Sequence, residues 1–184
     1  MDTWVVNLDS QPERWATIQN HLEGFGIVPN RWPATPDDHR VRLWTDLPRP
    51  DQTRRRAIVN TYQRLLAHLK DTDSDRWLIL QDDVRALSTP VRDNPGPLHI
   101  YGGWRVKPLL QGLDGIWRTS GDPYLSKSHV CPQAFALHRT LLAELASVWG
   151  DETRQVCTSW QPLVDRFATF DVQPTIEPGI TDGV

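Results

Sequence analysis

The stretch LILQDDVRAL, residues 78–87, joins a short apolar run directly to two adjacent acids, Asp82 and Asp83. Residues 76–81 have the length and composition of a buried β-strand. Adjacent carboxylates repel each other, and a bound divalent cation would offset that repulsion. Two interpretations are open at this point: a solvated turn after the strand, or a pair of ligands presented to a metal ion.

Outward from this strand, the hydrophobic pattern alternates between strands and helices. This alternation is typical of an α/β domain with a mostly parallel sheet flanked by helices. The 184 residues fit one domain spanning 1–184 and are enough to bury a core. Further strands are expected at residues 3–8, 98–101, 130–137 and 169–172. Helices are expected after the first strand and at residues 57–70, 141–149 and 160–168.

The first strand leads through a tight turn into a helix. Ser10 and Glu13 have the spacing of a capping box, in which each side chain bonds the other residue's backbone N–H. Two segments carry an apolar stripe at helical spacing. The stripes are formed by Trp15, Ile18, Leu22 and Phe25, and by Ile58, Tyr62, Leu65, Leu66 and Leu69. The proline-rich segment between these helices, residues 29–53, predicts a long loop with one short strand near 41–44.

The composition bounds the cellular context and the partners. The formal net charge of −3 supplies no overall attraction to nucleic acid or to an anionic membrane. Two cysteines imply no disulfide framework and favour reduced thiols in an intracellular protein. We find no apolar run of about 20 residues and no signal-peptide pattern, so a cytoplasmic protein without a membrane span is expected.

Polar residues follow two of the expected parallel strands. Asn7, Leu8 and Asp9 end the first strand, and Asp82 and Asp83 end the strand at 76–81. Ligands of open α/β sheets bind just beyond the carboxyl ends of the strands. Carboxylate oxygens suit Mg²⁺ or Mn²⁺, which take further oxygens from substrate phosphates. The position of the two acids after an apolar strand strengthens the case for a metal ion at this edge of the sheet, and a solvated turn stays open as the alternative.

The opening WVVNLDSQPERW, residues 4–15, resembles the start of family 25 glycosyltransferases, the bacterial lipooligosaccharide galactosyltransferases and their collagen-modifying relatives. The matching positions are Asn7, Leu8, Asp9, Pro12, Glu13 and Arg14, and then Arg31 and Ala34 at the end of a second strand. LILQDDV is similar to the family's strand ending in Leu-Glu-Asp-Asp-Val. HVCPQAFALHRTLLAEL and QPLVDRF resemble its later strand–helix unit and Pro-x-x-x-Asp segment. The resemblance covers most of the chain in order.

The resemblance implies a single-domain GT-A fold, which is Rossmann-like, and sugar transfer from a nucleotide-diphosphate sugar to a hydroxyl group with inversion. It also implies Mn²⁺ or Mg²⁺ held against the diphosphate, with Asp83 as the first ligand and Asp82 on the metal or on the donor ribose. The two histidines that flank the late strand, His129 and His138, are candidates for a further ligand, although a lone histidine beside a strand is often structural.

The same resemblance implies the other site residues. Donor contacts are expected from the first strand–helix turn, at Asn7, Leu8, Asp9, Arg14 and also Asp82. For Arg14, pairing with Glu13 or Asp9 is the alternative. An inverting transferase needs a base for the acceptor hydroxyl, and Asp165 is the candidate, with a surface ion pair to Arg166 as the alternative.

The acceptor is expected to be a glycan or a modified base in DNA, as with phage enzymes that glycosylate their own genome. Trp104 could stack on the acceptor or simply pack in the core. Arg55, within the run Arg54–Arg56, could contact acceptor phosphates or lie on a solvated helix start.

The chain departs from the family at Gln81, which stands where the acidic triplet has a glutamate. This departure motivates a second hypothesis, a catalytically inactive GT-A-fold module that binds a nucleotide or a glycan. A phosphoryl-transfer enzyme is a third class, but we find no P-loop pattern.

Overall fold

Strands form where apolar residues run together, and helices form where they recur every three or four positions. The computed structural model describes residues 1–36, 50–86, 96–102, 110–111, 117–118, 133–149, 161–170 and 176–178. The helices are α1 (Pro12–Glu23), α2 (Pro50–Lys70), η1 (Arg139–Leu141), α3 (Leu142–Val148) and α5 (Gln161–Phe167). The strands are β1 (Asp2–Asn7), β2 (Pro29–Pro33), β3 (Arg76–Gln81), β4 (Val84–Ala86), β5 (Leu98–Gly102), β6 (Leu110–Gln111), β7 (Trp117–Arg118), β8 (Ala134–His138), β9 (Ala168–Phe170) and β10 (Ile176–Pro178).

Eight of the described strands form one sheet in the order β2-β1-β3-β8-β5-β9-β7-β6, and β4 pairs with β10 apart from it. β1 is parallel to both of its neighbours, β2 and β3. β8 runs antiparallel between β3 and β5, and β7 is antiparallel to β9 and β6. Apart from β8 and β7, the strands of this sheet point the same way. The predicted α/β class with a mostly parallel sheet is confirmed.

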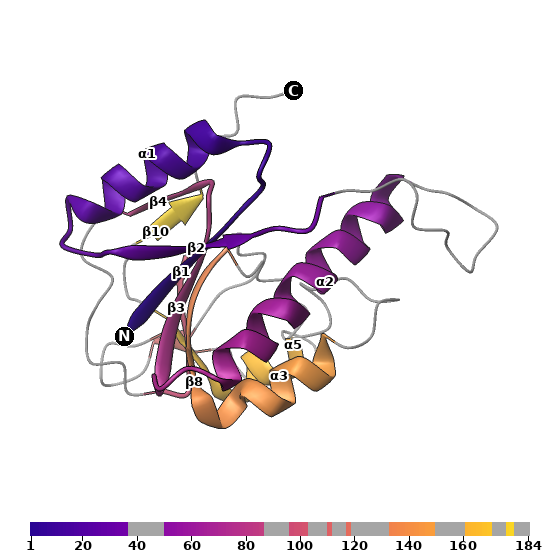
Figure 1. Ribbon diagram of the computed structural model, residues 1–184. Coiled ribbons are helices and arrows are strands. Elements are labelled where there is room, and N and C mark those ends of the chain that lie inside the picture. The colour runs from indigo at the N-terminus through magenta and orange to yellow at the C-terminus, as the bar shows by residue number, and fades with distance from the viewer. Residues whose placement is uncertain are drawn as a thin grey trace.

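Helices cover both faces of the sheet (Figure 1). On one face, α1 packs Ile18 and Leu22 against strand residues, which include Val5, Leu78 and Leu80, and together they form one of two buried hydrophobic clusters. On the other face, α2, α3 and α5 bury a larger cluster around Trp77 and Ile79. Alternate residues of β3 therefore pack into hydrophobic clusters on opposite faces of the sheet, because successive side chains of a strand point to opposite faces.

The predicted apolar stripes are confirmed, whereas three local predictions are wrong: the capping box, the start of α2, and the long loop over residues 29–53, which contains β2. Ile18, Leu22, Tyr62 and Leu65 are buried as expected. The capping box does not form, because the N-cap of α1 is Gln11 and not Ser10, and Gln11 makes no side-chain cap bond. α2 begins at Pro50 rather than at residue 57. The strand expected near 41–44 lies outside the described residues.

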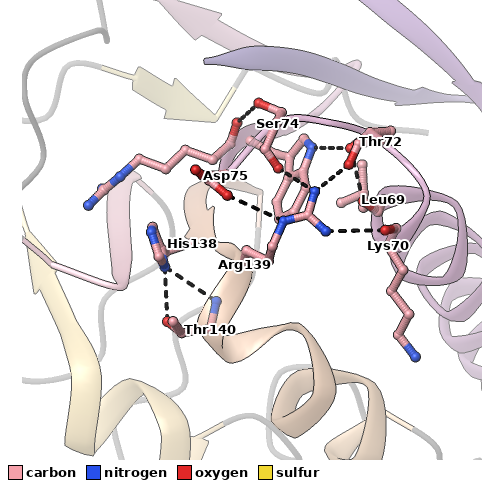
Figure 2. Close-up of polar contacts among 10 residues, drawn as sticks. Leu69, Lys70, Thr72, Ser74, Asp75, His138, Arg139 and Thr140 are labelled. Carbon is pink, nitrogen blue, oxygen red and sulfur yellow. Dashed lines mark hydrogen bonds and ion pairs between the residues drawn. The ribbon is translucent and has the colours of Figure 1, made fainter.

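Arg139 joins the end of α2 to the start of β3 (Figure 2). Its Nη1 donates to the Lys70 carbonyl at 3.1 Å, and its Nη2 donates to the carbonyls of Thr72 and Ser74. The guanidinium carbon also lies 5.3 Å from the centre of the buried Trp77 ring. One planar group thus satisfies carbonyls of the helix end and of the following turn, which would otherwise need water or a cap.

Among the helices that the structure describes, we find none long and apolar enough to cross a membrane.

Candidate functional site

The three parallel strands β1, β2 and β3 end at the same edge of the sheet. Asn7 ends β1 and Gln81 ends β3, so the polar segments that follow these strands are neighbours in space although they are far apart in the chain. The backbone N–H of Asp82 bonds the Val6 carbonyl at 3.2 Å, which fixes the turn after β3 against β1. This is the edge at which open α/β sheets bind ligands.

Asn7 lies at the centre of this edge and is 1% exposed. Its Nδ2 donates to Asp82 Oδ2 at 2.7 Å and to the Gln11 carbonyl at 3.0 Å. A hydrogen bond to a carboxylate is charge-assisted and stronger than one between neutral groups. Asn7 therefore holds Asp82 and the start of α1 in one fixed arrangement.

Two arginines extend this contact into a longer polar chain. Arg31 on β2 donates from Nε to Asn7 Oδ1 at 2.8 Å and from Nη2 to Asp9 Oδ1 at 2.8 Å. Arg14, in the first turn of α1, places Nη1 3.8 Å from Asp82 Oδ1. We call Asp9, Arg31, Asn7, Asp82 and Arg14 the polar chain. Its two aspartates and two arginines are joined through the neutral amide of Asn7. Arg14 and Asp9 lie at its solvent-exposed ends, where a phosphate or ribose hydroxyls could reach the chain.

Asp83 occupies the turn between β3 and β4, next to the polar chain. The residue is partly exposed, and its Oδ1 atom is buried. β4 leaves the main sheet and pairs antiparallel with β10, with Val84 opposite Pro178. The turn is thus fixed on both sides, by β1 before the acids and by β10 after them.

Gln81 points to the opposite face of the sheet from Asn7 and Asp82. Its Nε2 donates to the Tyr62 hydroxyl on α2 at 3.2 Å. Its backbone N–H bonds the carbonyl of Gln133, just before β8. The alternation of β3 requires this orientation, because Trp77 and Ile79 also face the α2 side. The side-chain amide of Gln81 therefore lies away from the polar chain.

The structure brings together most of the described site residues that the sequence singled out. Asn7, Asp9, Arg14 and Asp82 are joined in the polar chain, whereas Leu8 contributes a turn carbonyl. Arg55 lies on α2 and Asp165 on α5. Trp104 and His129 lie outside the described residues.

His138, the other histidine considered as a metal ligand, lies away from Asp82 and Asp83. It ends β8 opposite Arg76, at the far end of β3 from the acids, and its ring caps η1 by accepting from the Thr140 N–H. Arg31 was a matching position of the family resemblance, but sequence reasoning missed that it links Asn7 to Asp9. The available signal was a charged residue inside a short strand bounded by two prolines.

A divalent cation fits the two acids only together with further oxygen ligands. Among the described residues, no group of three or more His, Cys, Asp or Glu could hold a metal ion. Mg²⁺ usually takes one or two carboxylates and completes its shell with waters and substrate phosphates, so two adjacent carboxylates fit that chemistry. Asp82 accepts through Oδ2 from Asn7, and Asp83 follows it in the turn before β4, so the two acids present their carboxylates side by side.

Comparison with known proteins identifies the fold. No protein-family model and no curated protein matches the sequence. A crystal structure of a glycosyltransferase involved in the glycosylation of the major capsid of PBCV-1 matches with a TM-score of 0.57 and 8% identity, covering 99% of this chain and 93% of that chain. The galactosyltransferase LgtC, in complex with donor and acceptor sugar analogues, matches with a TM-score of 0.56 and 11% identity, covering 99% and 88%.

At such low identity these matches concern the fold. The strand order, the helices on both faces and the acids at the carboxyl edge occur in a chain that superposes along almost its full length on these two enzymes. The chain has the α/β fold of GT-A glycosyltransferases.

Proposed function

We propose that this protein is a metal-dependent glycosyltransferase that moves a sugar from a nucleotide-diphosphate sugar to a hydroxyl acceptor. The observation that carries the proposal is the 2.7 Å bond from Asn7 to Asp82, beside Asp83, at the carboxyl edge of this sheet. That bond fixes one carboxylate of an acid pair where a donor diphosphate would arrive. The likeness in fold to two glycosyltransferases supports the same reading.

In this proposal the two acids have different tasks. Asp83 would hold Mn²⁺ or Mg²⁺, whose chemistry is to offset the charge that develops on the leaving nucleoside diphosphate. Asp82, oriented by Asn7, would accept hydrogen bonds from the donor ribose or assist at the metal. Arg14 would face the donor phosphates, since its side chain is 48% exposed beside Asp82.

The remaining parts of the proposal come from the family 25 resemblance. They are an inverting displacement, with Asp165 as the base that takes the proton of the acceptor hydroxyl, and a single cytoplasmic domain spanning residues 1–184. The acceptor is a glycan or a modified DNA base. A steep fall of acceptor binding with rising salt would select DNA, because phosphate contacts release counterions.

Thermal unfolding with nucleotide sugars tests donor binding directly. We expect one of UDP-, GDP- or TDP-sugar with Mn²⁺ to stabilise the protein by about 2.7 kcal/mol at 100 times its dissociation constant. For a chain of this size that is a rise in melting temperature of roughly 5–10 °C. The measurement is differential scanning fluorimetry with and without the metal.

The matched control is the same nucleotide sugar with EDTA, which should give a much smaller shift. Absence of stabilisation by every nucleotide with metal would refute the proposal. Stabilisation without any sugar transfer or donor hydrolysis would instead select the inactive binding module.

The orientation of Gln81, away from the polar chain, favours an active glycosyltransferase over the inactive binding module. We expect Gln81→Glu to change turnover by less than about threefold, which is under roughly 1 kcal/mol. The side chain at 81 faces Tyr62, whose hydroxyl can donate to a carboxylate as readily as it accepts from an amide. The measurement is the steady-state rate of donor turnover, compared between Gln81→Glu and the wild type.

Gln81→Leu is the companion variant, because it removes the amide that donates to the Tyr62 hydroxyl and adds no charge. We expect this variant to have a lower free energy of unfolding and a similar affinity for the donor. A tenfold or greater gain in turnover in Gln81→Glu would show that the missing acid belongs to the site.

A further inference from the structure

We infer that Arg31 is a positioning residue of the donor site, which acts on Asp82 through the amide of Asn7. The inference rests on the proposed function for its consequence, but its structural step is measurable without any donor. Arg31 lies on the edge strand β2 opposite Val5 of β1, two residues before Asn7. Its side chain reaches along β1 to the Asn7 amide at the carboxyl edge.

Arg31 and two acceptors together determine which way the Asn7 amide faces. An asparagine amide has one acceptor oxygen and one donor nitrogen with two hydrogens. Arg31 is a donor only, so the group that faces it must be Oδ1, at 2.8 Å from Nε. Nδ2 then faces Asp82 Oδ2 and the Gln11 carbonyl, which both accept. In the flipped amide, Oδ1 would face two acceptors and Nδ2 would face a donor.

The two contacts of Arg31 differ in their surroundings. The Asp9 side chain is 75% exposed, so the ion pair between Arg31 and Asp9 is screened by water and contributes little. The Asn7 side chain is buried, so the bond from Arg31 to Oδ1 is shielded from solvent. Arg31 therefore acts mainly through Asn7, and the edge strand β2 is the element that delivers it.

The consequence is a preorganised carboxylate. With Arg31 in place, Asp82 receives the 2.7 Å bond from Asn7 before any donor binds. Without Arg31, Oδ1 of Asn7 loses its donor, so only the two Nδ2 bonds hold the amide, and Asp82 is less firmly oriented before the donor arrives. Loss of such an orienting partner typically costs about 10–100-fold in the affinity of a site.

The test compares Arg31→Met with Arg76→Met. Arg76 is a matched control because it is also a strand arginine that donates to one carbonyl, that of Gly96, but at the opposite end of β3. The first readout is hydrogen exchange of the Asn7 side-chain amide by NMR, with the resonance identified by its loss in Asn7→Ala. We expect exchange to quicken by at least about tenfold in Arg31→Met and to stay unchanged in Arg76→Met.

The second readout is steady-state kinetics with the donor identified by thermal unfolding. Arg31→Met should raise the donor KM about 10–100-fold with a smaller change in kcat. Arg31→Lys keeps one donor near Asn7 and should recover part of the loss. Arg76→Met should leave KM unchanged even if the melting temperature falls.

The outcomes separate the inference from the proposed function. Equal Asn7 exchange in Arg31→Met and in the wild type overturns the inference, whether or not a nucleotide binds. Faster exchange with an unchanged donor KM overturns the positioning role. A wild-type protein that binds no nucleotide overturns the proposed function and the role of Arg31 in donor binding, while the exchange data still decide whether Arg31 holds Asn7.

Discussion

Asp83→Ala should abolish metal-dependent donor turnover, with a loss of at least about 10³-fold, or roughly 4 kcal/mol of transition-state stabilisation. Asp83 is the acid of the pair that lies outside the polar chain, so it is the proposed metal ligand. Its removal should weaken Mn²⁺ binding in the presence of a nucleoside diphosphate, as measured by calorimetry. The fold should survive, because the turn is fixed by the Asp82 backbone and by the pairing of β4 with β10.

Asp73→Ala provides the matched control for this variant. Asp73 is an exposed aspartate in the turn before β3, at the other end of the sheet from Asp83. Its replacement should leave donor turnover and metal binding unchanged. Asp83→Asn, which keeps the shape and removes the charge, should lose activity nearly as fully as Asp83→Ala. Wild-type turnover in either Asp83 variant at saturating metal would refute the site assignment.

Arg139→Ala should lower the free energy of unfolding by about 2–3 kcal/mol, because hydrogen bonds to a charged donor are each worth roughly 1.5–3 kcal/mol and several carbonyls lose their partner. The affected carbonyls are those of Lys70, Thr72 and Ser74 (Figure 2). For a chain of this length, the melting temperature should fall by roughly 5–10 °C. Urea unfolding followed by circular dichroism measures the change.

Two companion variants identify the cause of this loss. Arg139→Lys keeps the charge but not the planar fork, and it should lose most of the stability as well. Asp75→Ala removes only the ion pair to Arg139 Nε, in which the aspartate side chain is 78% exposed, and it should cost less than about 1 kcal/mol. A larger loss in Asp75→Ala than in Arg139→Ala would mean that the ion pair, and not the carbonyl bonds, stabilises this turn.

Local patterns were sufficient for the helices and the central strands. The stripe through Tyr62 and Leu65 predicted α2, and the apolar run at 76–81 predicted β3 with its bounds. These predictions succeeded because burial acts on residues that are close in sequence, with the period of the element that carries them. The capping box at Ser10 and Glu13 failed because the turn at Leu8–Gln11 makes Gln11, and not Ser10, the N-cap of α1. The carbonyl of Gln11 accepts from Asn7, and the helix begins after it.

Sequence by itself also determined which edge of the sheet carries the polar residues, since a polar segment that follows a buried strand must lie at the end of that strand. It could not determine which of these side chains meet. The bond from Asn7 to Asp82 joins residues 75 positions apart, and Arg31 reaches Asn7 only because β2 pairs with β1 in one register. Strand order and register are set by the packing of the whole sheet, and no local pattern encodes them. The alternation along β3 turns Gln81 and Asp82 to opposite faces, but only the tertiary structure decided that Gln81 meets Tyr62 of α2 and that Asp82 meets Asn7 of β1.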